Sequence, residues 1–357
     1  MILFLFALAR AALAADPGVL LLHGDAGPTP WTDGLAAGAV EEAGGKAAIQ
    51  REYLGGLAHD AEAVYDFAQR LKERLHGPVR VVVATDATAA AFAAKYREDL
   101  FPEAAMVLAG ADRIGADRLT LCGECAALGF ETDLDGTLDL IFALRPGTRL
   151  VAGIADGTPA GRAARESLKR AMERRRNKAT LIFPGHEPGD DNGLDLDGLA
   201  DVLSNMPSHG VAVLLRFAED NAGSPVDAGR LYHVLETRLG SPVFVLTDAM
   251  LGSGVAGGVL VTGRETGRRA VRLAQRILAG EPVREMLPEP VKAQTVLDGT
   301  ALARFGMRPV DGAIVVNRPA APETTDGLAP GFAPLVLAIL LAFVAALFLL
   351  RRYRQNR

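Results

Sequence analysis

The sequence predicts an α/β protein with two lobes, each built on a parallel β-sheet with helices on both sides, and one further helix that crosses a membrane. Short apolar runs alternate with segments in helical spacing, which is typical of strands buried on both faces of a parallel sheet. This alternation occurs twice in series. A separate apolar stretch without a charge lies near the end of the chain, with the length that a bilayer requires.

The first series of elements occupies roughly the first third of the chain. Predicted strands lie at Gly18–Leu22, Ala47–Tyr53, Val79–Ala84 and Ala105–Ala109, and predicted helices at Thr32–Ala43, His59–Leu75 and Thr88–Tyr96. Runs such as RVVVATD show no polar alternation. We therefore expect each strand to lie inside a sheet and to be followed by a helix on one of its faces.

The second series repeats this order. Predicted strands lie at Arg149–Ile154, Ala179–Phe183, Val211–Phe217, Val243–Thr247 and Val259–Thr262, and predicted helices at Thr158–Arg175, Leu196–Leu203, Asp227–Leu239 and Thr266–Ala279. Late elements remain after the second series. The chain is therefore expected to cross between the lobes more than once, near residues 112–133, 251–258 and 288–297.

Both ends of the chain are apolar. Residues 1–14 have the form of a secretory signal peptide, with Ala12-Leu13-Ala14 before the cleavage site; an uncleaved anchor is the alternative. Residues 318–331 form a Pro-, Thr- and Gly-rich linker, and residues 332–350 are predicted to span the membrane. The Arg-rich tail at 351–357 is expected in the cytoplasm. A sorting signal removed after export is the alternative for this end.

Composition excludes several classes of function. The net charge of −5 and the pI near 5.8 give no basic surface for nucleic acid. Cys122 and Cys125 form a single C-G-E-C pair, which leaves a structural disulfide or a redox dithiol open but not a zinc site. No nucleophile elbow, phosphate-binding loop or zinc-protease motif occurs. We therefore expect no metal, no cofactor and no enzymatic activity.

Polar residues follow the predicted strands at their carboxyl ends, where open parallel sheets bind ligands. The candidate ligand contacts are His23, Trp31, Asp86, Asp112, Asp156, Thr158 and Asp248. Two alternatives remain open: each Asp caps the helix that follows it, and the Trp packs under its loop. Thr158-Pro159 is a typical helix start, and its free N–H groups suit an anionic group.

Several stretches, taken in order, resemble one known family. They include HGDAGPTPWTDGLAAG, ATDATAAAFAAKYREDLFP, ETDLDGTLDLIFALRPGTR, ADGTPAGR and LGSGVAGGVLVTGRETGRRAVRLAQRILAGEPV. The order resembles the type I periplasmic binding fold, in the branch of ABC-transporter substrate-binding proteins that also provides sensor domains of bacterial histidine kinases. Two stretches at the expected cleft depart from the family pattern, Thr85-Asp86-Ala87 and Gly24-Asp25.

The resemblance implies a Venus-flytrap module over residues 16–317. Lobe 1 is expected at about 16–118 and 257–290, and lobe 2 at about 130–250 and 291–317. The implied function is a membrane-anchored extracytoplasmic protein, single-pass in the inner membrane, that binds a small polar ligand by cleft closure and signals through a partner such as a histidine kinase. A tethered substrate-binding component that serves an ABC permease, and an exported hydrolase, are the alternatives. The sequence does not name the ligand.

Overall fold

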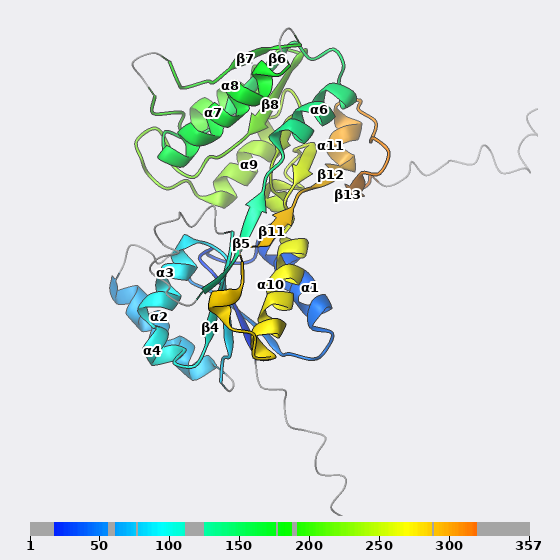
Figure 1. Ribbon diagram of the computed structural model, residues 1–357. Helices are drawn as coiled ribbons and strands as arrows, with labels where there is room; N and C mark the ends of the chain where they lie inside the picture. Colours follow the sequence, from blue (N-terminus) through cyan, green and yellow to red (C-terminus); the bar gives the residue numbers. More distant parts are fainter. Residues whose placement is uncertain are drawn as a thin grey trace, which may run out of the picture. The chain divides into compact units, whose positions relative to one another are not determined.

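The computed structural model describes residues 18–55, 61–75, 78–110, 125–175, 178–187, 191–287 and 289–319 (Figure 1). The predicted signal peptide, most of the linker, the predicted membrane helix and tail, Cys122 and the candidate contact Asp112 lie outside these residues. Within the described part of the chain, no helix has both the length and the apolar character needed to cross a bilayer.

The first sheet is parallel throughout, in the order β11-β5-β4-β3-β1-β2. Its strands are β1 (Val19–His23), β2 (Ile49–Tyr53), β3 (Val81–Ala84), β4 (Ala105–Ala109), β5 (Cys125–Glu131) and β11 (Glu289–Lys292). The first four strands match the predicted ones within about two residues. We call this sheet and its helices lobe 1.

Alternation along the buried strands divides lobe 1 into two cores. Leu20 and Leu22 of β1 pack with α2 (Ala61–Arg74), α3 (Ala87–Lys95) and the short α4 (Arg97–Leu100). Val19 and Leu21 face the other way and pack with α1 (Pro30–Ala43) and α10 (Gly263–Leu278). Figure 1 shows the two sets of helices on opposite sides of the sheet.

The second sheet has the order β13-β12-β10-β9-β8-β6-β7. Its strands are β6 (Leu150–Ile154), β7 (Thr180–Ile182), β8 (Gly210–Leu214), β9 (Val243–Val245), β10 (Gly257–Leu260), β12 (Gln294–Asp298) and β13 (Ile314–Val316). All pairs are parallel except β10 with β12. We call this sheet and its helices lobe 2.

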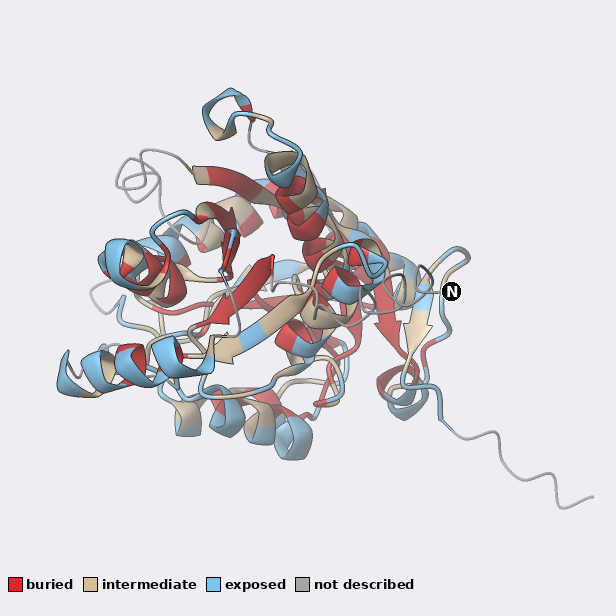
Figure 2. Ribbon diagram, turned by 90° about the horizontal axis from the view of Figure 1, so that it is seen from below, coloured by how far each residue is buried: buried red, intermediate tan, exposed pale blue. Residues whose placement is uncertain are grey.

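Lobe 2 has the same three-layer construction. One face of the sheet packs with α6 (Leu134–Leu144), α7 (Pro159–Glu173) and α11 (Gly299–Arg304). The other face packs with α8 (Leu196–Ser204) and α9 (Ala228–Arg238). Short 3-10 turns, η2 and η3, lie at Asp248–Met250 and Val283–Glu285. In Figure 2 the strands are mostly buried, and the exposed residues lie largely on the outer sides of helices.

The chain passes between the two sheets three times. It leaves lobe 1 from the carboxyl end of β5 and enters α6, leaves lobe 2 after β10 and enters α10, and leaves β11 at Lys292 to begin β12 at Gln294. Strands β5 and β11 are paired, so two of these connections start side by side (Figure 1). Parallel strands therefore point their carboxyl ends toward the connections.

The second crossing differs from the predicted boundary, which placed residues from 257 onward in lobe 1. Strand β10 pairs with β9 and β12 in lobe 2, and the change of lobe follows it. Two glycines fit this strand between its neighbours: a Cβ on Gly257 would lie 2.1 Å from the Val296 carbonyl oxygen, and one on Gly258 would lie 2.2 Å from that of Val245. The glycine-rich stretch is thus the start of an inner strand with close backbone neighbours.

Helices α1 and α10 of lobe 1 are packed backbone to backbone. A Cβ on Gly38 would lie 1.9 Å from the Arg264 carbonyl oxygen, and one on Gly267 would lie 1.9 Å from that of Leu35. Ion pairs from Glu41 to Arg264 and Arg268 bridge the same helices on the solvent side. This contact fixes α10, the first helix after the second crossing, against the helix that follows β1.

Candidate functional site

The carboxyl edge of lobe 1 is organised around His23, the last residue of β1. Its side chain is fully buried and stacks on Tyr53 of β2, with ring centroids 4.9 Å apart. Its Nδ1 lies 2.9 Å from the hydroxyl oxygen of Thr85, which follows β3. Its Nε2 is enclosed and has no hydrogen-bond partner in the described part of the chain.

The bonds of Thr85 determine which ring nitrogen of His23 carries the proton. The Thr85 hydroxyl donates to the Leu22 carbonyl at 3.2 Å or to Asp86 Oδ2 at 3.3 Å, and both of these groups only accept. The hydroxyl oxygen therefore accepts from Nδ1–H of His23, and Nε2 keeps a free lone pair. Burial first, and then the charge of Arg51, lower the pKa of His23 from 6.5 to about 4, so the ring is neutral near pH 7.

Asp86 lies beside His23 and is engaged with the backbone. It is the N-cap of α3: Oδ1 accepts from Ala89 N at 2.9 Å, and Oδ2 accepts from Gly24 N at 2.6 Å. The carboxylate thereby ties the loop after β1 to the start of α3. The strand-end position predicted for Asp86 is correct, and its contacts within the lobe are those of a helix cap.

Trp31 belongs to α1 and not to the preceding loop. Its ring is buried and meets Phe130 of β5 edge-on, with centroids 5.5 Å apart. This is the packing alternative of the two that the sequence left open. The capping box of Thr29 with Thr32 and the proline at the first helical position start the helix two residues earlier than expected.

Asp156 is the central residue at the carboxyl edge of lobe 2. Its side chain is fully enclosed two residues after β6. Oδ1 accepts from the hydroxyl of Thr158 at 2.5 Å, and Oδ2 accepts from Ala218 N at 2.9 Å. Thr158 caps α7 with Gly161 N at 3.0 Å, and Pro159 is the first helical residue, as predicted. Asp156 therefore positions the start of α7 and the chain after β8.

Arg216 is a partly exposed cation beside Asp156 and was not among the predicted site residues. Its Nε lies 3.2 Å from Asp156 Oδ2 without hydrogen-bond geometry, and its side chain is 36% exposed. The backbone carbonyl of Arg216 accepts from Asp156 N at 3.0 Å, which holds the two residues together. The signal in the sequence was a lone charge at the end of the apolar run VAVLLRF.

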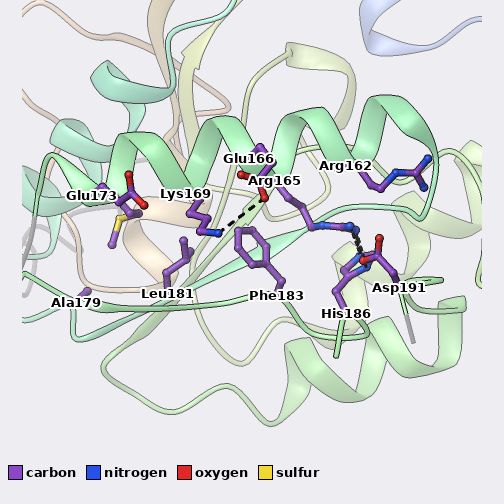
Figure 3. Close-up of a pocket in the computed structure, with 11 residues that line it drawn as sticks. Arg162, Arg165, Glu166, Lys169, Glu173, Ala179, Leu181, Phe183, His186 and Asp191 are labelled. Carbon is purple, nitrogen blue, oxygen red and sulfur yellow. Dashed lines mark hydrogen bonds and ion pairs between the residues drawn. The ribbon is translucent and has the colours of Figure 1, made fainter. Parts of the chain in front are cut away.

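A second polar cluster lies at the same edge, next to the N-terminal part of α7. Arg165 donates to Asp191 Oδ1 at 2.5 Å, and His186 Nε2 lies 2.8 Å from the Ala155 carbonyl. Burial raises the pKa of Asp191, but hydrogen bonds from His186 and Arg165 outweigh it and hold that pKa below its usual value. Figure 3 shows the three side chains turned toward one another.

These residues close one end of a groove of about 720 Å³ between α7 and the edge strand β7. Leu181 and Phe183 line it on the β7 side, and Lys169, Glu166 and Glu173 line it on the helix (Figure 3). The groove lies along the outside of lobe 2, so it is separate from the strand-end residues predicted to contact a ligand.

Asp248 lies after β9, at the second crossing. Both of its carboxylate oxygens accept from Gly263 N, at 3.1 and 3.0 Å, and Gly263 is the first residue of α10. Asp248 thus fastens a turn that follows a strand of lobe 2 to the first helix of the returning chain.

The structure places six of the seven predicted site residues. It brings His23 together with Asp86, and Asp156 together with Thr158, while Trp31 packs in a core and Asp248 lies at a crossing. Asp112 lies outside the described residues. Among the residues that the structure describes, no group of three or more His, Cys, Asp or Glu is arranged to hold a metal ion.

Comparisons with known proteins find fold relatives only. No family model and no curated protein matches the sequence. Among solved structures, the chain is similar to an ABC domain from Streptococcus pneumonia in complex with L-Trp, at TM-score 0.56 and 13% identity over 84% of this chain and 99% of that chain. It is similar to a conserved domain protein from Vibrio cholerae, at TM-score 0.55 and 13% identity over 82% and 95% of the two chains.

A ligand-free, open substrate-binding protein with adhesive properties from Clostridium difficile is also similar, at TM-score 0.52 and 13% identity over 84% of this chain and 98% of that chain. At this identity the likeness shows the fold. Together with the two sheets, parallel except for the β10–β12 pair and joined by three crossings, it identifies the type I periplasmic binding fold. The predicted two-lobed α/β fold is therefore confirmed, while the predicted membrane helix lies outside the described residues.

Proposed function

We propose that this protein binds a small polar molecule at the carboxyl edges of its two lobes and responds by bringing the lobes together. Such a ligand binds the closed state more tightly than the open state and shifts the population toward it. A preference of about 5.5 kcal/mol turns a 1:99 ratio into 99:1. Ligand binding would therefore be detected as a change in the ratio of open to closed molecules.

The observation that carries this proposal is unused hydrogen-bonding capacity at both edges. In lobe 1, the lone pair of His23 Nε2 has no partner among the described residues. In lobe 2, the guanidinium of Arg216 donates no hydrogen bond to a carboxylate of the described residues. The carboxylates of Asp86 and Asp156, in contrast, already accept hydrogen bonds from groups of their own lobes. Buried polar groups are normally paired, so an unpaired one at a strand end indicates a partner that arrives from outside.

The fold relatives support binding over catalysis. Two of the similar structures are described as a domain that holds L-Trp and as a substrate-binding protein. A small ligand with hydrogen-bond donors and an anionic group fits this class. We therefore retain the expectation of a binding protein, with no chemical step assigned to it.

We further propose that the protein is held in the inner membrane by residues 332–350, with residues 16–317 outside the cytoplasm. The apolar segment and its Arg-rich flank support this, since cytoplasmic flanks carry excess Lys and Arg. The proposed partner is a histidine kinase or an ABC permease. Fusing either alkaline phosphatase or a fluorescent protein after Arg357 tests the topology: fluorescence without phosphatase activity is expected, and the reverse pattern would exclude this anchor.

Ligand binding is tested by thermal unfolding of the purified protein with a panel of amino acids, sugars and small organic acids. A ligand at 100 times its Kd is expected to stabilise the protein by about 2.7 kcal/mol. Small-angle scattering is expected to show a smaller radius of gyration with the same ligand. Asp86→Ala and Asp156→Ala are expected to reduce the effect, because each removes a group that positions its edge. Asp227→Ala, at the exposed cap of α9, is the matched control.

A panel that yields neither stabilisation nor compaction would exclude the proposed function. Turnover of one of the compounds would instead favour the exported hydrolase.

A further inference from the structure

Two guanidinium groups lie around Asp156, and they differ in how they are used. Arg165 is held inside lobe 2: its side chain is 9% exposed, and it donates to Asp191 and, at 3.4 Å, to the carbonyl of Asp156. Arg216 lies beside the Asp156 carboxylate with a side chain that is 36% exposed. The cluster therefore contains one buried arginine and one that is partly exposed.

The carboxylate of Asp156 accepts no hydrogen bond from the guanidinium of Arg216, whose paired N–H donors we call its fork. Its oxygens already accept from Thr158 and Ala218, and Nε of Arg216 lies 3.2 Å from Oδ2 without hydrogen-bond geometry. The Arg216 side chain forms an ion pair with Asp156, and it donates no hydrogen bond to any described residue. Asp156 thus supplies a nearby negative charge that holds the guanidinium in place and leaves its donors available.

The position of Arg216 is fixed by the sheet. It follows β8 by two residues, and its carbonyl accepts from Asp156 N. Strand β8 lies between β6 and β9, inside the sheet, so the base of the side chain has little freedom. A guanidinium fixed at its base and free at its tip loses less entropy when it binds a partner.

The chemistry of the free fork selects its partner. A planar guanidinium with parallel N–H donors matches a carboxylate in two-point contact. The N-terminus of α7, a helix of 15 residues that begins beside Asp156, adds positive potential at the same edge. Neutral polyols match this arrangement less well, because they offer no charge to the fork.

We propose that Arg216 binds the carboxylate of the ligand, which makes that ligand a small carboxylic acid of the amino-acid or hydroxy-acid kind. This inference rests on the proposed function, because it assigns the chemical class of the molecule bound at the same strand ends. Arg216 is thereby the residue that discriminates an acid from its neutral amide.

The test uses the full-length protein, the twenty proteinogenic L-amino acids with lactate and malate as probes, and glucose, ribose and galactose as neutral probes. Each acid that binds is compared with its carboxamide by isothermal titration. Wild type is expected to bind the acid about 10- to 100-fold more tightly than the carboxamide, the range for hydrogen bonds to a charged group. Arg216→Gln is expected to lose most of that ratio while binding the carboxamide as before.

Two further variants distinguish the effect of two-point hydrogen bonding by Arg216 from the effects of its charge and of folding. Arg216→Lys keeps the charge without the fork and is expected to retain part of the ratio. Arg238→Gln, at the exposed end of α9, is the matched control and is expected to bind as wild type does. Thermal unfolding without ligand shows whether each variant is folded.

An unchanged ratio of acid to carboxamide in folded Arg216→Gln would overturn the inference. So would a wild-type protein that binds only the sugars, and in that case the proposed function stands. If none of the acids or sugars binds, the proposed function fails and this assignment fails with it.

Discussion

The neutral, buried imidazole of His23 makes the protein sensitive to acid in a defined pH window. The pKa of this group falls from 6.5 to about 4 on folding, first because of burial and then because of Arg51, with Asp33 opposing. Between these two values the unfolded chain takes up a proton that the folded protein does not. Stability must therefore decrease as the pH falls from about 6.5 to about 4.

The size of this effect follows from the shift. One pKa unit corresponds to about 1.4 kcal/mol, so His23 alone is expected to remove about 3 kcal/mol from the free energy of unfolding across the window. Carboxylates such as Asp135 and Asp191, whose pKa values are lowered by their arginine or histidine partners, lose stabilising charge at still lower pH. The contribution of His23 therefore has to be isolated by comparison.

The comparison is between wild type and His23→Gln, unfolded in urea at pH 7, 6, 5 and 4 and followed by circular dichroism. Gln retains an acceptor and donors for Thr85 but does not titrate in this range. We expect the wild-type free energy of unfolding to fall about 3 kcal/mol further than that of the variant. His233→Gln, at a side chain that is 73% exposed, is the control and should follow wild type. Parallel pH profiles for wild type and His23→Gln would refute the neutral buried imidazole.

Two other predictions concern folding stability. Gly38→Ala places a Cβ 1.9 Å from a backbone carbonyl oxygen of α10, so we expect the free energy of unfolding in urea to fall by about 1–3 kcal/mol. Gly27→Ala, in open space, is the control and should change this free energy by less than about 0.5 kcal/mol. Equal effects would contradict the close packing of the two helices. Asp298→Ala removes a buried N-cap of α11 that also accepts a hydrogen bond from Asn317, so we expect the free energy of unfolding to fall by about 2–3 kcal/mol. Asp195→Ala, at the exposed N-cap of α8, should lower it by about 1 kcal/mol. A smaller loss for the buried cap would contradict this account.

Strand positions could be predicted because parallel strands are apolar on both faces. Val81–Ala84 and Val211–Leu214 have no alternation in the sequence and are buried throughout in the structure. Helix starts were predictable where the capping chemistry is local, as at Thr158-Pro159. Strands β5, β11, β12 and β13 were not predicted individually, because their burial depends on partners elsewhere in the chain.

The candidate site was predicted only as a location. Strand-end polar residues do lie at the carboxyl edges, but the sequence does not show which of them form all their hydrogen bonds within their own lobe. Asp86 and Asp156 accept bonds from backbone N–H groups around 60 residues away or within their own helix starts. Such bonds form only once the sheet has aligned its strands. In the sequence, an Asp that caps a helix therefore cannot be distinguished from an Asp that contacts a ligand.

The sequence by itself determined the two-lobed fold class, the order of most strands and helices, and the edge of each sheet where polar groups gather, because these follow from hydrophobic period and local capping. Tertiary structure alone decided which polar groups at those edges are left with unused donors or acceptors. That outcome depends on distances between segments remote in sequence. Thr85 accepts a hydrogen bond from His23 Nδ1, and Ala218 N donates to Asp156, which forms an ion pair with Arg216 without accepting a hydrogen bond from it.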